Sequence, residues 1–152
     1  MTVVLEGKEG IVARLGQEIG PGPWIEVTQD RINRFAEAGG DFQWIHVDEE
    51  RAKQGPYGAT IAHGLLTLAM VNALTEGLLA FKGFRMAVNY GYEKVRFLTP
   101  VVVGTRLRAR VKPLTCEEGS GGTVMTVVEI TVEIEGKDKP ACVAQMIFRH
   151  VI

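Results

Sequence analysis

Residues 64–81, with the sequence GLLTLAMVNALTEGLLAF, decide the architecture of this chain. Apolar side chains occupy nearly every face of a helix drawn through them, and Asn72 is the one strongly polar residue in the middle. A helix of this kind must be covered by protein on all sides. The segment therefore predicts one long apolar core helix, from Gly64 to about Phe81, and the rest of the chain has to cover it.

Two later segments, residues 105–112 and 123–135, alternate apolar and polar side chains, which is typical of half-buried strands. The turn at residues 118–121 predicts that they form an antiparallel hairpin, and a register centred there satisfies both faces. Its pairs are Leu107 with Val132, Ala109 with Ile130, Val111 with Val128, Arg106 with Glu133 and Arg110 with Glu129. The arginines are therefore expected to form a solvated charge ladder, which is a better interpretation than a phosphate-binding stripe.

Further strands fit residues 84–98, 141–151 and, in a short form, 24–27. In the strand at residues 84–98, the apolar side chains switch from even-numbered to odd-numbered positions part-way along. This switch predicts a bulge or bend near Gly91. Such a bend lets a sheet curl. Long curved strands beside one apolar helix indicate an α+β fold in which a curved antiparallel sheet is wrapped around that helix.

The part of the chain before the core helix predicts one confident helix, which begins after the hydroxyl N-cap Thr28 and ends at Gly39 and Gly40. The next segment, residues 41–58, is rich in turn signals and has one possible helical turn near residues 48–54. Two of the three histidines lie in this irregular segment or where it joins the core helix. We expect the functional site there, because sites are often built on loops.

The composition fits one domain spanning residues 1–152, with 46% hydrophobic residues, 23% charged residues and a formal net charge of -1. This balance argues against nucleic acid or an anionic membrane as a partner. Charges within the first twenty residues argue against a secretory signal, and no apolar run reaches the roughly 20 residues of a membrane span. Cys116 and Cys142 fit neither a zinc site nor a disulfide framework, so we expect a cytoplasmic protein.

Asp41 and His46 are a candidate catalytic pair. Their separation of five residues fits neither one helix face nor one strand face, so only a turn could bring the side chains together. A carboxylate beside a group that titrates near neutrality is suited to position and deprotonate a water molecule. The alternative interpretation is that Asp41 caps a turn and His46 is an ordinary loop histidine.

His63 and Gly64 indicate the N-terminus of the core helix. The first N–H groups of a helix lack internal partners, and a glycine lets a ligand oxygen approach them, so Gly64 could stabilise an enolate or thioester oxygen. Alternatively, His63 only caps the helix and Gly64 relieves packing. A third interpretation takes Asp41, His46 and His63 as a metal site, although the usual short His-x-Asp spacing is absent.

Three motifs at characteristic separations connect these residues. They are Gly40-Asp41-x-x-x-Ile45-His46-x-Asp48, then His63-Gly64, and then Phe97-x-x-Pro100-Val101-x-x-Gly104. Together they resemble the MaoC-like (R)-specific enoyl-CoA hydratases, nearer to the nodulation-protein-N-like branch. The resemblance covers about residues 28–115.

The resemblance implies a hot-dog fold, a homodimer and an acyl-CoA thioester as substrate, with no metal and no cofactor besides the CoA of the substrate. Asp41 and His46 would hold and activate the water added to a trans-2-enoyl-CoA, which gives the (R)-3-hydroxyacyl-CoA. The Gly64 N–H would bind the thioester oxygen, with His63 beside it among the substrate-binding residues. Rival hypotheses are a thioesterase on the same fold and a non-catalytic acyl-CoA-binding module.

Two departures from the family pattern concern this site. Gln43 and Trp44 stand where the family commonly has Asn-Pro, which lengthens one hydrogen-bonding side chain and removes a rigid turn. Asn72 stands where these hydratases can carry a serine that supports the aspartate. A buried amide without partners costs about 1 to 3 kcal/mol, so a buried Asn72 is expected either to hydrogen-bond to neighbouring backbone or to face the site. The resemblance implies the second, in which the Asn72 amide donates to Asp41 and supports it.

Overall fold

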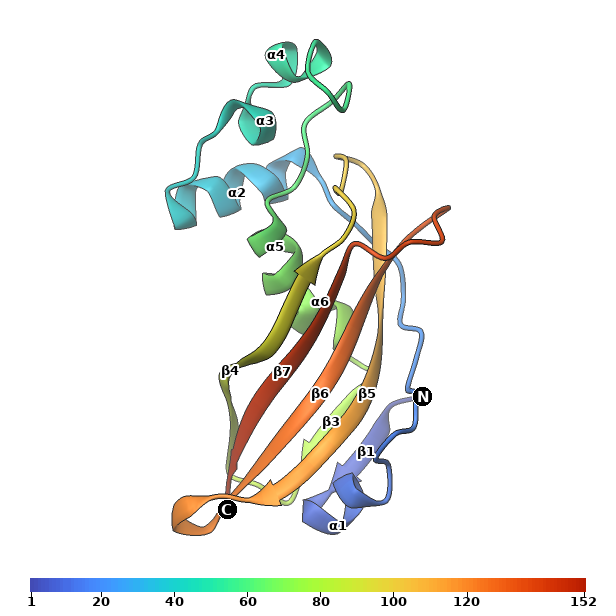
Figure 1. Cartoon of the computed structure of the whole chain (residues 1–152), viewed down its shortest axis with the longest axis vertical. Helices are drawn as coiled ribbons and strands as arrows, with labels where there is room; N and C mark the ends of the chain where they lie inside the picture. The colour runs from blue at the N-terminus through green and yellow to red at the C-terminus, as the bar shows by residue number, and fades with distance from the viewer.

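The computed structural model describes residues 1–152 and is built around a five-stranded antiparallel sheet with the strand order β2-β5-β6-β7-β4. The sheet curls around helices α5 and α6, while α2, α3 and α4 gather at one end of it (Figure 1). Its strands are β2 (Ile25–Glu26), β4 (Met86–Phe97), β5 (Arg106–Glu118), β6 (Thr123–Ile134) and β7 (Cys142–Val151). The predicted α+β class and the curved sheet are confirmed.

The helices are all short. They are α1 (Gly7–Val12), α2 (Gln29–Gly39), α3 (Trp44–Val47), α4 (Glu49–Lys53), α5 (Gly64–Ala69) and α6 (Val71–Thr75). The prediction for α2 is confirmed, because the Thr28 side chain accepts a hydrogen bond from Arg31 N–H and Gly40 ends the helix with a left-handed φ of 74°. None of these helices has the length and hydrophobicity of a membrane-spanning segment.

The core segment differs from the prediction of one helix that reaches Phe81. It forms α5 and α6, which meet at Met70 and are joined by a hydrogen bond from Leu74 N–H to Met70 O (2.9 Å). Helix α6 ends at Thr75 because Gly77 adopts a left-handed φ of 79°. The residues beyond it form β3 (Leu79–Lys82), which pairs in parallel with β1 (Val3–Glu6), two strands that the sequence did not predict.

The rest of the chain also does not cover this core segment, α5 and α6, on all sides. Its inward side contributes to a cluster of 20 buried residues shared with β5, β6 and β7. Three residues at helical spacing face outward and are exposed, namely Leu65, Ala69 and Asn72. The expectation that protein surrounds the helix on all sides is therefore wrong for a single chain.

The hairpin of β5 and β6 forms as predicted, but its register is shifted by two residues. Leu107 pairs with Ile134, Ala109 with Val132 and Val111 with Ile130. The turn lies later than predicted, at Ser120–Gly122, and the pairing shifts again between Pro113 and Thr115. An even shift keeps every side chain on its predicted face, because side chains alternate with a period of two.

The charge ladder on the outer face is present with changed partners. The predicted pairs Arg106 with Glu133 and Arg110 with Glu129 are wrong. Glu135 binds Arg106, whereas Glu133 binds both Arg108 and Arg110. The predicted bulge is confirmed, since the β4–β7 register shifts between Asn89 and Gly91.

Candidate active site

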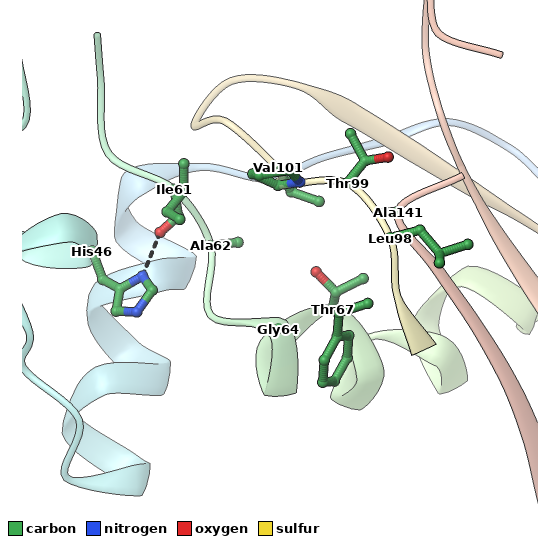
Figure 2. A pocket seen from close by; sticks show the side chains of 11 residues that line it. His46, Ile61, Ala62, Gly64, Thr67, Leu98, Thr99, Val101 and Ala141 are labelled. Atoms are coloured by element: carbon green, nitrogen blue, oxygen red, sulfur yellow. Dashed lines mark hydrogen bonds between the residues drawn. The ribbon is translucent and has the colours of Figure 1, made fainter. Parts of the chain in front are cut away.

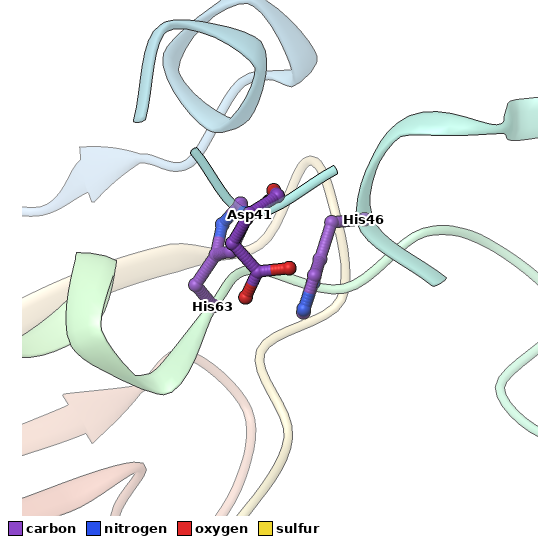
Figure 3. A group of neighbouring side chains, drawn as sticks. All are labelled: Asp41, His46 and His63. Carbon is purple, nitrogen blue, oxygen red and sulfur yellow. The ribbon is translucent and has the colours of Figure 1, made fainter. Parts of the chain in front are cut away.

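Asp41 follows directly on the glycine that ends α2, and the chain then turns into the four-residue helix α3, which carries His46. The backbone N–H of Gln43 donates to Asp41 Oδ1 (3.2 Å), which closes the turn after the aspartate. The Asp41 carboxylate points toward the His46 ring (Figure 3). One polar atom from each of Asp41, His46 and His63 lies within 4.8 Å of the other two. The turn therefore brings the candidate pair together.

The His46 ring is held in one orientation. It is 6% exposed, and its Nδ1 lies 2.7 Å from the carbonyl oxygen of Ile61, as the dashed line in Figure 2 marks. A carbonyl oxygen can only accept, so Nδ1 carries the proton. In the neutral ring Nε2 is then left with a free lone pair, which is the form that a general base requires.

His63 contacts both members of the pair. Its Nε2 donates to the backbone oxygen of Asp41 (3.0 Å), and its ring stacks on His46 with centroids 3.8 Å apart and planes inclined by 23°. The ring of Phe35 packs against the same imidazole, with a centroid separation of 4.9 Å. His63 is the N-cap residue of α5, but its side chain makes no capping bond to the helix, so capping does not explain the imidazole. His63 instead fixes the backbone at Asp41 and the plane of His46.

A cavity of about 270 Å³ begins at His46 and runs past the start of α5 (Figure 2). Gly64 lines it, and the Gly64 N–H has no hydrogen-bond partner within the chain. The Phe97 ring lies against Gly64, where a Cβ atom would come within 3.1 Å of it. The other lining residues are mostly apolar: Ile61, Ala62, Thr67, Leu98, Thr99, Pro100, Val101 and Ala141.

The family model for the MaoC-like domain matches residues 11–135 of the chain. The chain belongs to the MaoC-like family. Over 146 residues, this MaoC-like chain is 48% identical to 3-hydroxyacyl-thioester dehydratase Z of Mycobacterium tuberculosis, covering 96% of this chain and 97% of that protein. It is 42% identical to nodulation protein N of Rhizobium leguminosarum bv. viciae over 139 residues, covering 90% and 86% respectively.

The fold of the MaoC-like chain is also found among solved structures. The R-hydratase PhaJ1 from Pseudomonas aeruginosa superimposes with a TM-score of 0.68 at 21% sequence identity, and the match covers 90% of this chain and 81% of that chain. The predicted family and hot-dog fold are thus confirmed. The 48% identity to the dehydratase over most of both chains makes this MaoC-like chain an enzyme of the hydro-lyase class, with a hydratase or dehydratase role.

The family departure at Gln43 and Trp44 has a structural explanation for Trp44. Its ring packs against Gly55, where a Cβ atom would come within 3.0 Å of the indole, and the Arg51 guanidinium lies 4.3 Å above the ring centroid. Packing of the indole thus stiffens the loop where the family commonly has a proline. Gln43 acts through its backbone N–H, which any residue except proline has.

The prediction of a buried Asn72 that supports Asp41 is wrong within one chain. Asn72 is exposed on α6 and lines a different cavity, together with Thr75 and Phe81. The Asp41 carboxylate receives its backbone hydrogen bond from Gln43 instead. The physical reason is that the outward face of the core segment is left uncovered, so the amide is not forced to find an internal partner.

The metal interpretation fits the spacing of the three groups but not the orientation of the rings. A metal ion lies along the lone pair of a ligating nitrogen, which is in the plane of the imidazole. The two imidazoles are stacked 3.8 Å apart with planes inclined by only 23°, so one ion within bonding distance of both rings cannot lie in both ring planes. The arrangement suits proton transfer better than metal binding.

Sequence reasoning missed three groups that hold the site: the carbonyl of Ile61, the hydroxyl of Thr60 and the side chain of Gln29. Ile61 O accepts from His46, and Gln29 Nε2 donates to His46 O. These contacts join residues 15 and 17 positions apart in the chain. No local sequence pattern predicts such a hydrogen bond, since Gln29 looks like any polar residue in the first turn of a helix.

Proposed function

We propose that this enzyme adds water to trans-2-enoyl-CoA to give (R)-3-hydroxyacyl-CoA and catalyses the reverse dehydration. The observation that carries the proposal is that the Asp41 carboxylate lies beside the His46 ring, and that His46 lines the same cavity as Gly64. The dehydratase relative is named for a 3-hydroxyacyl thioester, and the structural relative is named an R-hydratase. The first name supports a 3-hydroxyacyl thioester as the substrate class, and the second agrees with the proposed stereochemistry.

In the proposed reaction, one water molecule is held between Asp41 and His46 Nε2. His46 takes a proton from it, and the water oxygen bonds to C3 of the enoyl thioester while the electron pair of the double bond moves toward the thioester oxygen. The protonated pair then gives its proton to C2. The same steps in reverse remove water, and general acid–base catalysis of this kind contributes about 10² to 10⁴ in rate.

The Gly64 N–H would donate to the thioester oxygen as negative charge develops on it. This amide has no internal partner, and Gly64 has no side chain that would crowd an approaching oxygen. An oxyanion donor typically contributes about 10² to 10³ in rate. The acyl chain would lie against the apolar side of the core helices.

The proposed reaction moves only a proton and a hydroxyl group, so it needs no redox cofactor. In this proposal Asp41, His46 and the Gly64 N–H supply the proton transfers and the charge stabilisation without a metal. The CoA group belongs to the substrate. A formal net charge of -1 gives the chain no general attraction to nucleic acid or to an anionic membrane, and a cytoplasmic location fits a substrate that carries CoA.

A homodimer is the proposed assembly, formed through the edge strand β4. This strand is hydrogen-bonded only to β7, and its apolar residues Met86, Val88 and Tyr90 are exposed. An exposed apolar edge strand is a template for pairing with another chain. Light scattering coupled to size-exclusion chromatography should give twice the monomer mass, and Val88→Lys should shift the species toward the monomer.

The activity test offers a trans-2-enoyl-CoA and follows two signals at once. Loss of the conjugated absorbance reports hydration, and a thiol reagent reports free CoA. Hydration without thiol release is expected, and chiral analysis of the product should give the (R) isomer. Thiol release without hydration would identify a thioesterase, and binding without either reaction would identify an acyl-CoA-binding module.

A further inference from the structure

A polar network that is independent of Asp41 holds the loop carrying His46. Gln29, the first residue of α2, donates from Nε2 to the backbone oxygen of His46 (2.8 Å) and to Asn33 Oδ1 (2.9 Å). Its Oε1 accepts a hydrogen bond from the hydroxyl of Thr60, whose side chain is 1% exposed. Both N–H groups and the oxygen of the Gln29 amide are therefore engaged.

The same hydrogen-bond network includes the segment that precedes α5. Ile61 N–H donates to Ile45 O (3.0 Å), and His46 Nδ1 donates to Ile61 O (2.7 Å). Thr60, the residue before Ile61, binds Gln29, which in turn binds His46 O. The ring of His46 is thus hydrogen-bonded directly to the segment before α5. The backbone of His46 is connected to the same segment through the side chain of Gln29.

Helix α3 needs such a tie because it has only four residues. Helices of this length are not stable by themselves in water. If the backbone of His46 moves, the bond from Nδ1 to Ile61 O weakens, and with it the tautomer that leaves Nε2 free. A displacement of about 1 Å in a catalytic group can cost on the order of 10² in rate.

We propose that Gln29 is a positioning residue for the reaction, which acts through His46 and does not touch substrate. This inference rests on the proposed function of His46 as the general base. Glutamine is required over glutamate, because a carboxylate cannot donate to the His46 carbonyl oxygen. Thr60 supports Gln29 by holding its oxygen.

The kinetic test compares Gln29→Met, which keeps the length of the side chain, with Asn33→Ala, which removes only the exposed partner of the same amide. Gln29→Met should lower kcat by about 10- to 100-fold, with KM for the enoyl-CoA changed by less than about 3-fold. Asn33→Ala should keep wild-type kcat. Thr60→Val should lower kcat, and Thr60→Ser, which restores the hydroxyl, should recover most of it.

Two results would overturn the inference. One is a wild-type kcat in Gln29→Met, and the other is a loss of kcat that merely follows the folded fraction measured by circular dichroism at the assay temperature. A drop in kcat in a fully folded Gln29→Met enzyme, with Asn33→Ala unaffected, supports it.

A second readout does not depend on activity. In the ¹⁵N spectrum of histidine-labelled protein, His46 should give the signature of a ring protonated at Nδ1, and Gln29→Met should convert it to a mixture of tautomers. If the wild type fails to hydrate enoyl-CoA but this change is seen, the proposed function fails and the positioning of His46 by Gln29 stands. If the wild type is active and Gln29→Met leaves both kcat and tautomer unchanged, the positioning role fails.

Discussion

Two buried histidines of this enzyme, His46 and His150, lie in opposite surroundings. His46 has one nitrogen bonded to a backbone oxygen and a carboxylate close to its ring, at the edge of a cavity. His150 is 0% exposed, its Nε2 meets the hydroxyl of Thr126 (2.9 Å), and the rings of Phe81 and Phe84 lie 4.5 and 4.7 Å from it. Burial lowers the pKa of His150 to about 4.

The difference gives a physical reason why the proposed function assigns a catalytic role to one of these buried imidazoles and not to the other. His150 is enclosed by aromatic rings, which stabilise the neutral form and offer no route for a reacting group. His46 combines a fixed tautomer with a carboxylate and an opening toward solvent. The comparison predicts that changes at the first site affect turnover and that changes at the second affect stability.

The largest effect is expected from Asp41 and His46, the proposed catalytic pair. Asp41→Asn and His46→Gln should each lower kcat by about 10³-fold, because each removes a group that holds or accepts the proton of the water. Both variants should keep the far-ultraviolet circular dichroism spectrum of the wild type. His150→Phe is the matched control and should retain most of its kcat at temperatures where it is folded. Equal losses of kcat in the His46 and His150 variants would contradict the conclusion that the two histidines have different roles.

The next effect concerns stability. Above about pH 6.5, the ordinary pKa of histidine, His150 is neutral in the folded and unfolded states. Between about pH 6.5 and 4 the unfolded chain takes up a proton that the folded chain does not, so the free energy of unfolding should fall by about 3 kcal/mol over this window. Urea titrations at a series of pH values would measure the fall.

His150→Phe provides the control for that titration. Carboxylates bound to arginine also lose stabilisation in acid, so the contribution of His150 is the difference between the two proteins. His150→Phe should show a shallower dependence on pH in the same window. Parallel curves would mean that His150 is not the group that titrates.

A smaller effect is expected at the mouth of the cavity. Gly64→Ala should lower kcat by about 10²-fold, because the new methyl group lies within 3.1 Å of the Phe97 ring and crowds the amide proposed to bind the thioester oxygen. Gly39→Ala is a suitable control, since its Cβ would lie 3.8 Å from its nearest neighbour. Adding Phe97→Leu to Gly64→Ala separates the two causes: recovery of kcat would point to the clash, and no recovery would point to the amide.

The smallest effect on kcat is expected at His63, where two variants separate the contributions of its two contacts. His63→Gln keeps a donor for Asp41 O but loses the stack on His46, whereas His63→Phe keeps a ring and loses the donor. We expect each variant to lower kcat by about 10-fold, and His63→Ala to lower it further. Steady-state kinetics on folded variants would measure this, and a wild-type kcat in His63→Ala would remove His63 from the site.

Much of the fold could be predicted because it follows from local signals. Thr28 and Gly40 bound α2 through capping, and the alternation along β5 and β6 assigns their faces. The register could not be predicted, because an even shift leaves every face unchanged and the turn and the bulge near Pro113 choose between the alternatives. The break at Met70 and the pairing of β1 with β3 depend on contacts between distant segments.

The candidate site also has some features that could be predicted from the sequence and others that could not. The identities of Asp41, His46 and Gly64 could be selected from the sequence because their chemistry and spacing are distinctive. The exposed position of Asn72 could not, because the sequence of a helix does not say which of its apolar faces a single chain leaves uncovered. The contacts behind the proposed role of Gln29 were equally hidden, since its partners are His46 and Thr60.

The sequence by itself therefore determined the α+β class, the helix that precedes the site and the residue types able to activate water, since capping, periodicity and side-chain chemistry act over a few residues. Only the tertiary structure decided which imidazole nitrogen carries the proton, which ring stacks on which, and which histidine is sealed among aromatic rings. Those outcomes depend on hydrogen bonds and packing between segments 15 or more residues apart. The order of residues along the chain does not encode such contacts locally.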